Sequence, residues 1–378
     1  MIPALCRLAA LAGAGLAGAG LAPAGPAAAR DAAAETLRVA TWNAGLTREG
    51  PGLLLRDILS GSDPQVAAAA RVIAAADPDI LLLTGVDYDR RLAALSAFAA
   101  VLRAEGADYP YLFAFRPNTG SMTALDLDGD GRLRGPGDAQ GWGRFAGAGG
   151  MALLSRLPID TGGARDFSGL LWADLPGALA GGVPQSDLAI RRLSTTGHWD
   201  VPVFLPEGGR LSLLAWYATP PVFGRGDENA RRNHDEAAFW RLLLDGALPF
   251  PPPDAPFVIL GDANLDPADG AGMSGALDAL LSDPRLADPR PASAGGLASA
   301  TPGQRGDPAL DTADWPEPGD EPPGPGNLRV DYVLPSAGLT VARAGIWWPA
   351  PGERGAEDAA AASRHRLVWV DISVPRTP

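Results

Sequence analysis

Residues 79–87 read DILLLTGVD, an unbroken apolar run that ends in a carboxylate. A strand with one solvent face alternates apolar and polar residues, so this run is typical of a strand buried on both faces. Before it, residues 64–76 (PQVAAAARVIAAA) predict a helix, with Asp63 as N-cap and Pro64 at the first helical position. After it, residues 91–105 predict a second helix. A buried strand between helices indicates an α/β fold.

The rest of the chain repeats this mixture without a strict strand–helix–strand rhythm. A further helix is predicted at 229–245, and further strands at 37–42, 111–115, 151–155, 211–216, 257–260, 330–334 and 367–372. This order favours mixed sheets in one domain, residues 36–375, over a doubly wound parallel sheet. The Gly- and Asp-rich stretch 116–149 is too long for a simple connection, and such loops are usually functional or disordered.

The amino-terminal segment predicts export. Residues 8–21 contain only Ala, Gly and Leu, follow Arg7, and precede the small-residue run 27–29. This pattern is typical of a secretory signal peptide, residues 1–29, cleaved near Ala29. The alternative, a membrane anchor, is less favoured because the run is shorter than the roughly 20 residues of a spanning helix. We therefore expect a periplasmic or extracellular protein with no stable membrane anchor.

Composition narrows the chemistry of the exported part. The only cysteine, Cys6, lies within the predicted signal peptide, so the remainder has no disulfide, thiolate metal site or cysteine nucleophile. The net charge of −13 becomes −14 once Arg7 is removed, because residues 1–29 contain no acidic residue. Such a chain repels polyanions at long range, which disfavours tight non-specific binding of nucleic acid. We expect a monomer.

Polar side chains follow several of the predicted strands. They are Asn43, Asp87, Asp262 with Asn264, and Asp331. In α/β sheets, ligands collect at the carboxyl ends of strands. Carboxylate and amide oxygens suit a hard cation such as Mg²⁺ or Ca²⁺. A single Asp after a strand is usually a turn former, so the combination carries the prediction.

Six short segments of the sequence form an ordered series of motifs. They are TWNAGL (41–46), DPDILLLTGVD (77–87), GMALLSRLPI (150–159), GDANLD (261–266), LRVDYVLPS (328–336) and SRHRLVWVDI (363–372). The series resembles that of the endonuclease/exonuclease/phosphatase superfamily, which includes deoxyribonucleases, apurinic-site endonucleases, sphingomyelinases and inositol polyphosphate phosphatases. The resemblance implies a deoxyribonuclease-like, four-layered α/β sandwich of two mixed β-sheets flanked by helices, with the active site in loops at one end.

The resemblance also implies roles for individual residues. Asn43 would touch the metal or the phosphate. Asp262 would activate or orient the attacking water, and Asn264 would hold the phosphate oxygens. His365 would contact the phosphate as base or transition-state stabiliser, and Asp331 would accept its second ring proton. The alternative for His365 is a structural histidine on a loop before a strand.

Three positions depart from the family pattern. The family's Gln and Glu pair, whose Glu binds the metal, is replaced by Thr84 and Gly85. Asp87, two residues further on the same strand face, would reach the cation instead. Tyr217 stands where a catalytic His is common, and Arg364 stands where an Asp usually precedes the last His. Arg364 would supply positive charge directly to a phosphate.

Two other clusters are weighed beside the main site. Asp126, Asp128 and Asp130 match the start of a calcium loop, but Gly137 occupies the twelfth position, where a Glu belongs. A looser calcium site and a plain solvated turn both remain open. Residues 233–235 (NHD) are interpreted as caps of the helix that begins there.

The leading hypothesis is hydrolysis of a phosphoester by in-line attack of water, with Mg²⁺ or Ca²⁺ as cofactor. The substrate classes are nucleic acid, a phospholipid headgroup and a small organophosphate, and the acidic balance favours the last two. Trp142 and Phe145, in the long loop, would line the cleft and select the substrate. The alternative hypothesis is a non-catalytic binding protein that keeps the fold but has lost metal ligands, as Gly85 and Arg364 suggest.

Overall fold

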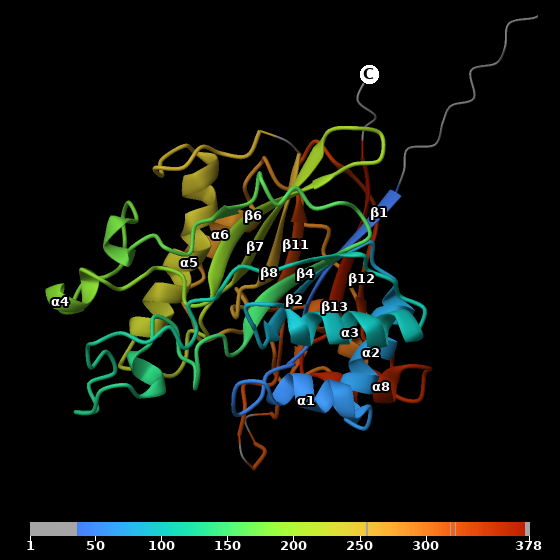
Figure 1. Ribbon diagram of the computed structural model, residues 1–378, viewed down its shortest axis with the longest axis horizontal. Helices are drawn as coiled ribbons and strands as arrows, with labels where there is room; N and C mark the ends of the chain where they lie inside the picture. The colour runs from blue at the N-terminus through green and yellow to red at the C-terminus, as the bar shows by residue number, and fades with distance from the viewer. Residues whose placement is uncertain (1–35, 255, 318, 322, 375–378) are drawn as a thin grey trace, which may run out of the picture. The chain divides into compact units, whose positions relative to one another are not determined.

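A computed structural model describes residues 36–254, 256–317, 319–321 and 323–374 (Figure 1). The predicted signal peptide lies outside these residues. Within them, no helix is both long and apolar enough to cross a membrane.

The predicted strands and helices recur with small shifts in their ends. The strands are β1 Thr36–Asn43, β2 Ile80–Val86, β3 Tyr111–Phe113, β4 Gly150–Ser155, β5 Arg165–Asp166, β6 Gly197–Phe204, β7 Arg210–Tyr217, β8 Phe257–Asp262, β9 Ala313–Asp314, β10 Asn327–Leu328, β11 Asp331–Pro335, β12 Thr340–Trp347 and β13 Leu367–Ser373. The helices are α1 Leu53–Ser60, α2 Pro64–Ala76, α3 Ala93–Ala104, α4 Gln185–Leu188, α5 Glu228–Leu244, α6 Gly275–Leu281, α7 Ala294–Ala298 and α8 Ala356–Ala362.

Two mixed sheets form the centre of the fold. The first has the order β12-β13-β1-β2-β4-β3, and the second has the order β11-β8-β7-β6-β5. In each sheet one central pair is parallel, β1 with β2 and β7 with β8, and the other pairs are antiparallel. The mixed sheets confirm the predicted fold class.

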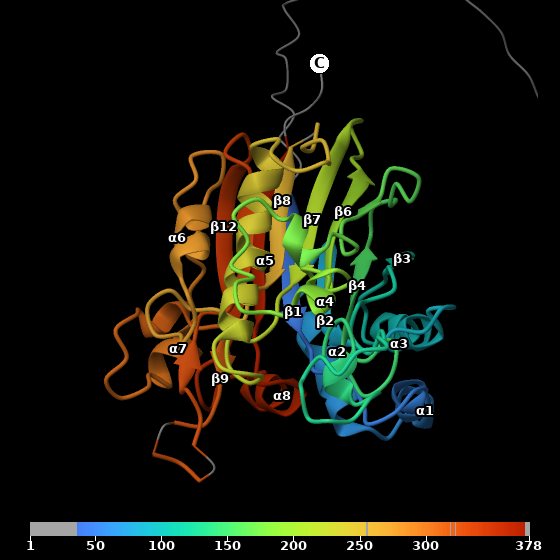
Figure 2. The same ribbon diagram turned by 90° about the vertical axis from the view of Figure 1, so that its left-hand side faces the viewer.

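The apolar side chains sort into layers. One buried cluster lies between the two sheets and includes Val39, Leu82, Leu213 and Leu260. A second lies between the first sheet and the helices α1, α2, α3 and α8, and a third lies between the second sheet and the helices α5 and α6. Figure 1 shows α5 and α6 on one side of the paired sheets and α1, α2, α3 and α8 on the other, and Figure 2 looks onto the face that α5 covers. The arrangement is the predicted four-layered sandwich.

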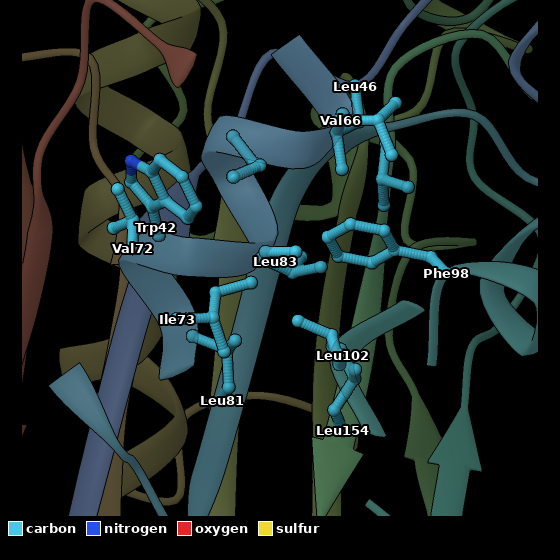
Figure 3. Packing of buried hydrophobic residues seen from close by; sticks show 14 of the residues in the cluster. Trp42, Leu46, Val66, Val72, Ile73, Leu81, Leu83, Phe98, Leu102 and Leu154 are labelled. Atoms are coloured by element: carbon cyan, nitrogen blue, oxygen red, sulfur yellow. The ribbon is translucent and has the colours of Figure 1, made fainter. Parts of the chain in front are cut away.

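Helix α2 illustrates how local sequence forms these layers. The Asp63 carboxylate accepts the backbone N–H of Val66 and caps the helix, and Pro64 starts it. The helix ends at Asp77, which adopts a left-handed conformation with φ 53°. Its buried face packs on β2 and α3 in a cluster that includes Ile73, Leu81, Leu83 and Phe98 (Figure 3).

Five strands were not predicted: the two-residue strands β5, β9 and β10, and the longer strands β6 and β12. β6 contains Pro202, which is disfavoured inside a sheet because it donates no backbone hydrogen bond. Pro202 is tolerated because its backbone faces away from β7, toward residues 158–160, where its carbonyl accepts the Asp160 N–H and no ladder bond to β7 needs the missing N–H. β12 is an edge strand with a largely exposed polar face, so it lacks an apolar run.

The interpretation of residues 233–235 as helix caps is wrong. Helix α5 starts at Glu228 with Asp227 as N-cap, so these residues lie inside the helix. There Asn233 is buried and donates to the carbonyls of Thr219 and Ala263. These side chains tie α5 to the loops around it.

Candidate active site

Four strand ends bring polar side chains to one edge of the sandwich. Asn43 ends β1, Tyr217 ends β7 and Asp262 ends β8, while Asp331 begins the antiparallel neighbour β11. Asp262 is paired in register with Tyr217 on one side and with Asp331 on the other. Parallel pairing of β7 with β8 and antiparallel pairing of β8 with β11 therefore place three functional groups side by side.

Asn43 connects the two sheets at this edge. Its Nδ2 donates to Asp262 Oδ2 at 2.9 Å and to the Tyr217 hydroxyl at 3.2 Å. Its Oδ1 accepts the backbone N–H of Gly45 at 3.2 Å. The amide thus points its nitrogen at the carboxylate of the second sheet and its oxygen at its own loop.

His365 lies on the loop before β13, in contact with Asp331. Its Nδ1 is 2.9 Å from Asp331 Oδ2 and 3.8 Å from Asp262 Oδ2. The Thr312 hydroxyl donates to Asp331 Oδ2 at 2.9 Å, and Trp42 Nε1 donates to the His365 carbonyl at 3.0 Å. The imidazole is therefore fixed through both its ring and its backbone, as the predicted pair requires.

Burial changes the proton affinities of this cluster. Burial, reinforced by the negative charge of Asp331, raises the pKa of Asp262 to about 7. For His365, burial alone lowers the pKa, but Asp331 and Asp262 together outweigh it and raise the pKa to about 9. Near neutral pH the cluster therefore combines a charged imidazole, that of His365, with a carboxyl group, that of Asp262, whose pKa lies close to the pH.

The same cluster has the donors of a cation site. Ligand atoms of Asp262, Asp331 and His365 all lie within 4.8 Å of one another. The second oxygen of Asp331, Oδ1, is buried and has no hydrogen-bond partner among the described residues. A buried carboxylate oxygen without a partner is costly, and a hard divalent cation would satisfy it. The residues present therefore fit such a cation.

Gly85 has no room for the side chain that the family pattern expects. Its φ is +65°, and a Cβ there would lie 2.2 Å from Asn43 Oδ1. The register of β2 against β4 also shifts between Thr84 and Val86, as in a β-bulge. The Asn43 amide therefore fills the space beside this position.

The Asp87 carboxylate binds loop residues, and within the described residues no hydrogen bond or ion pair joins it to Asp262, Asp331 or His365. Its Oδ1 accepts from the Thr47 hydroxyl at 2.6 Å and from the Gly149 N–H at 3.0 Å, and its Oδ2 accepts the Arg48 N–H at 2.9 Å. Burial raises the pKa of Asp87. The expectation from strand alternation assumed regular pairing from residue 85 to residue 87, but the bulge interrupts it. The carboxylate ties the loops after β1 and before β4 to the end of β2.

Asn264 contacts Asp262 through its backbone and is held by a neighbouring loop through its side chain. The Asn264 backbone N–H donates to Asp262 Oδ1 at 2.8 Å, and its side chain donates to the Ala218 carbonyl at 2.8 Å. Asn264 therefore lies at the cluster and supports Asp262.

Arg364 is exposed, and its guanidinium donates to the Asp314 carbonyl at 3.4 Å. Within the described residues, no hydrogen bond or ion pair joins it to the cluster.

The acidic loop at 126–130 forms a turn of its own. Carboxylate oxygens of Asp126, Asp128 and Asp130 lie within 4.8 Å of one another. Asp126 accepts the backbone N–H groups of Asp130 and Gly131. A solvated turn makes the same contacts.

Several residues of the site carry no signal in the sequence. Thr312 supports Asp331 through its hydroxyl, which also accepts the Val330 N–H at 2.9 Å. The Ser363 hydroxyl donates to the Asn43 carbonyl at 2.6 Å and joins β1 to the His365 loop. Only the fold brings these small hydroxyl residues to the site, because nothing in their neighbours distinguishes them.

Comparison with known proteins agrees with this geometry. The model of the Endonuclease/Exonuclease/phosphatase family matches residues 40–365, from β1 to His365. The chain belongs to the endonuclease/exonuclease/phosphatase family. Members of this family hydrolyse phosphoester bonds, and they are typically metal-dependent.

Solved structures of family members have the same fold. An endonuclease/exonuclease/phosphatase from Beutenbergia cavernae DSM 12333 is similar, with 21% identity and a TM-score of 0.52 over 90% of this chain and 72% of that one. A family protein from Leptotrichia buccalis C-1013-b has 14% identity and a TM-score of 0.50 over 89% of this chain and 100% of that one. A search of curated proteins finds no match.

Proposed function

We propose that this chain hydrolyses phosphoester bonds with the help of a divalent cation, Mg²⁺ or Ca²⁺. The observation that carries the proposal is the buried cluster of Asp262, Asp331 and His365, hydrogen-bonded to Asn43 from the opposite sheet. Family membership supports the reaction class. Buried charges are costly to a fold, so a cluster of ionisable groups at the end of a sandwich indicates a functional site.

Each residue has a role that follows from its environment. Asp262 removes the proton from the attacking water, because a pKa of about 7 suits a general base near neutral pH. Protonated His365 places positive charge where the phosphate gains negative charge. Asp331 keeps the imidazole charged and oriented through its 2.9 Å contact. Asn43 and Asn264 hold the carboxylate of Asp262 in place.

The cation would be held by Asp331, whose second oxygen has no hydrogen-bond partner among the described residues, and this leaves Asp262 free to act as the base. When bound, it neutralises charge on the phosphate oxygens and polarises the phosphorus centre.

The test is hydrolysis of bis(4-nitrophenyl) phosphate with Mg²⁺, with Ca²⁺ and with a chelator. We expect turnover that requires the cation and falls about 10²–10⁴-fold in Asp262→Asn and in His365→Ala. Asp358→Asn and His234→Ala are matched controls, because Asp358 pairs with Arg71 and His234 with Asp235, and within the described residues no hydrogen bond or ion pair joins either to the cluster. Cation-dependent turnover that survives both site variants would contradict the assignment.

The alternative function is phosphoester binding without turnover. The specific observation in its favour is Gly85, where the Asn43 amide leaves no space for a metal-binding side chain. Isothermal titration calorimetry with Mg²⁺ and with Ca²⁺ separates the two functions. No turnover and no cation binding by the parent protein would favour the binding protein.

We further propose that the protein is exported, on the basis of the pattern in residues 1–29, and that it is a monomer. Cell fractionation of the full chain and of a chain without residues 1–29 tests export. Light scattering of the purified protein tests the monomer. Retention of the full chain in the cytoplasm would contradict export.

A further inference from the structure

A cleft of about 770 Å³ opens beside the catalytic cluster. Asn43, Gly85 and Tyr217 line it at one end, and the loops 119–149 and 218–229 form its walls. Asn43 belongs to both the cleft and the cluster, because its amide contacts Asp262. The volume falls in the range of small-molecule sites, roughly 300–1,000 Å³. A substrate bound at the cluster therefore has space for a compact second part in this cleft.

Two aromatic rings line the cleft and are unusually exposed. Trp142 is 65% exposed and Phe223 is 77% exposed, and they come from different loops. Phe223 also adopts φ +70°, which is rare for a bulky residue and costs conformational energy. Exposed rings gain free energy when a flat apolar group covers them. The cleft is thus suited to a ligand with a planar ring.

Three arginines and two carboxylates, Asp128 and Glu228, line the cleft, so its lining carries a small positive charge in a chain that is strongly acidic. Arg232 lines the cleft and is 3% exposed, and its Nε and Nη2 donate to the carbonyls of Leu193, Gln140 and Arg192. Arg225 lines the cleft on the exposed loop. Among the described residues, neither arginine has a carboxylate within 4.0 Å, whereas the neighbouring Arg191 pairs with Glu228. A guanidinium without a carboxylate partner is suited to an anionic group of a ligand.

We propose that this cleft selects small phosphoesters that carry a planar aromatic ring and a second anionic group. This inference rests on the proposed hydrolysis for the position of the reacting phosphate. The ring packs against Trp142 and Phe223, and the second anion binds Arg225. The buried Arg232, whose Nε and Nη2 are held by backbone carbonyls, adds positive charge behind it. The cleft volume suits a compact ligand, and the net charge of −13 disfavours a polyanion.

Binding by calorimetry with three probes tests the selection. The probes are adenosine 3′,5′-bisphosphate, adenosine 5′-monophosphate, which lacks the second phosphate, and ribose 5-phosphate, which also lacks the ring. We expect affinity to fall by about tenfold on loss of the ring, the scale of one stacked base. We expect a fall of about three- to tenfold on loss of the second phosphate. Equal affinities for the three probes would overturn the proposal, as would tighter binding of a twelve-nucleotide single strand of DNA.

Variants assign the two preferences to their residues. Trp142→Ala and Phe223→Ala should abolish the preference for the ring and leave the preference for the second phosphate. Arg225→Gln should have the opposite effect, and it stands in for Arg232→Gln, whose buried site makes that variant prone to misfold. Phe204→Ala and Arg210→Gln are matched controls, because this pair lies at the far end of β6 and β7 from Tyr217.

Measurements of binding and of turnover distinguish failure of the cleft assignment from failure of the proposed hydrolysis. If the parent protein binds the three probes in the expected order but hydrolyses none of them, the proposed hydrolysis is wrong and the cleft assignment stands. If it hydrolyses them with equal kcat/KM and binds them equally, the hydrolysis stands and the cleft assignment is wrong.

Discussion

Restoring the family's glutamate at position 85 should damage this protein rather than improve it. The structure gives two reasons, the left-handed backbone at φ +65° and the 2.2 Å approach of a Cβ to Asn43 Oδ1. The first costs about 1–2 kcal/mol for an L-residue. The second forces a buried amide to move and costs about 1–3 kcal/mol as overpacking. Gly85→Glu should therefore lower the free energy of unfolding by about 2–5 kcal/mol.

The two contributions can be measured apart. Gly61 has the same φ of +65°, but a Cβ there meets nothing within 4 Å. In urea unfolding, Gly61→Ala should show the backbone cost alone, about 1–2 kcal/mol, and Gly85→Ala should show the full 2–5 kcal/mol. In an Asn43→Ala background, the extra cost at position 85 should disappear, because the clashing amide is gone.

Activity should fall together with stability. Displacing Asn43 breaks its 2.9 Å hydrogen bond to Asp262, so turnover should decrease even with the added carboxylate. A Gly85→Glu protein that is as stable as the parent and binds Mg²⁺ more tightly would refute this reasoning. Equal costs for Gly61→Ala and Gly85→Ala would refute the clash alone.

Three further predictions concern the cluster, a buried acid and the core. Asp331→Asn keeps the hydrogen bond from Thr312 but removes the negative charge beside His365, so kcat/KM should fall about 10²–10⁴-fold. The alkaline limb of the pH profile of kcat/KM, expected near pH 9 in the parent, should move to lower pH because the pKa of His365 falls. An unmoved limb would count against the Asp331–His365 pair. Burial raises the pKa of Glu236 from 4.5 to about 7, so its contribution to stability is present below pH 4.5 and is lost as the pH rises through 7. In urea unfolding, the free energy of unfolding of Glu236→Gln minus that of the parent should therefore rise by about 3 kcal/mol from pH 4.5 to pH 8. A difference that stays constant with pH would exclude this effect. Phe98→Ala removes a ring that is 1% exposed and should cost about 3–5 kcal/mol in the same assay, whereas a cost below 1 kcal/mol would mean that the core closes around the cavity.

The sequence alone was sufficient for most of the scaffold. The apolar runs of β2 and β8 and the capped helix α2 are local patterns, because a few neighbouring residues decide whether a strand is buried or where a helix begins. The ordered motifs also indicated the family. β6 was missed because Pro202 is compatible with a strand only where no ladder bond needs its missing N–H, and pairing is not a local property.

The details of the site needed the tertiary structure. Asn43 and Asp262 are 219 residues apart, and only the meeting of two sheets makes them hydrogen-bond partners. Gly85 looks like a lost ligand in the sequence, but the fold shows that Asn43 occupies the space beside it. Asp87 holds loops together, and Phe223 and Arg232 line one cleft. Strands and caps depend on neighbours in the chain, whereas clashes, clefts and shifted pKa values depend on neighbours in space.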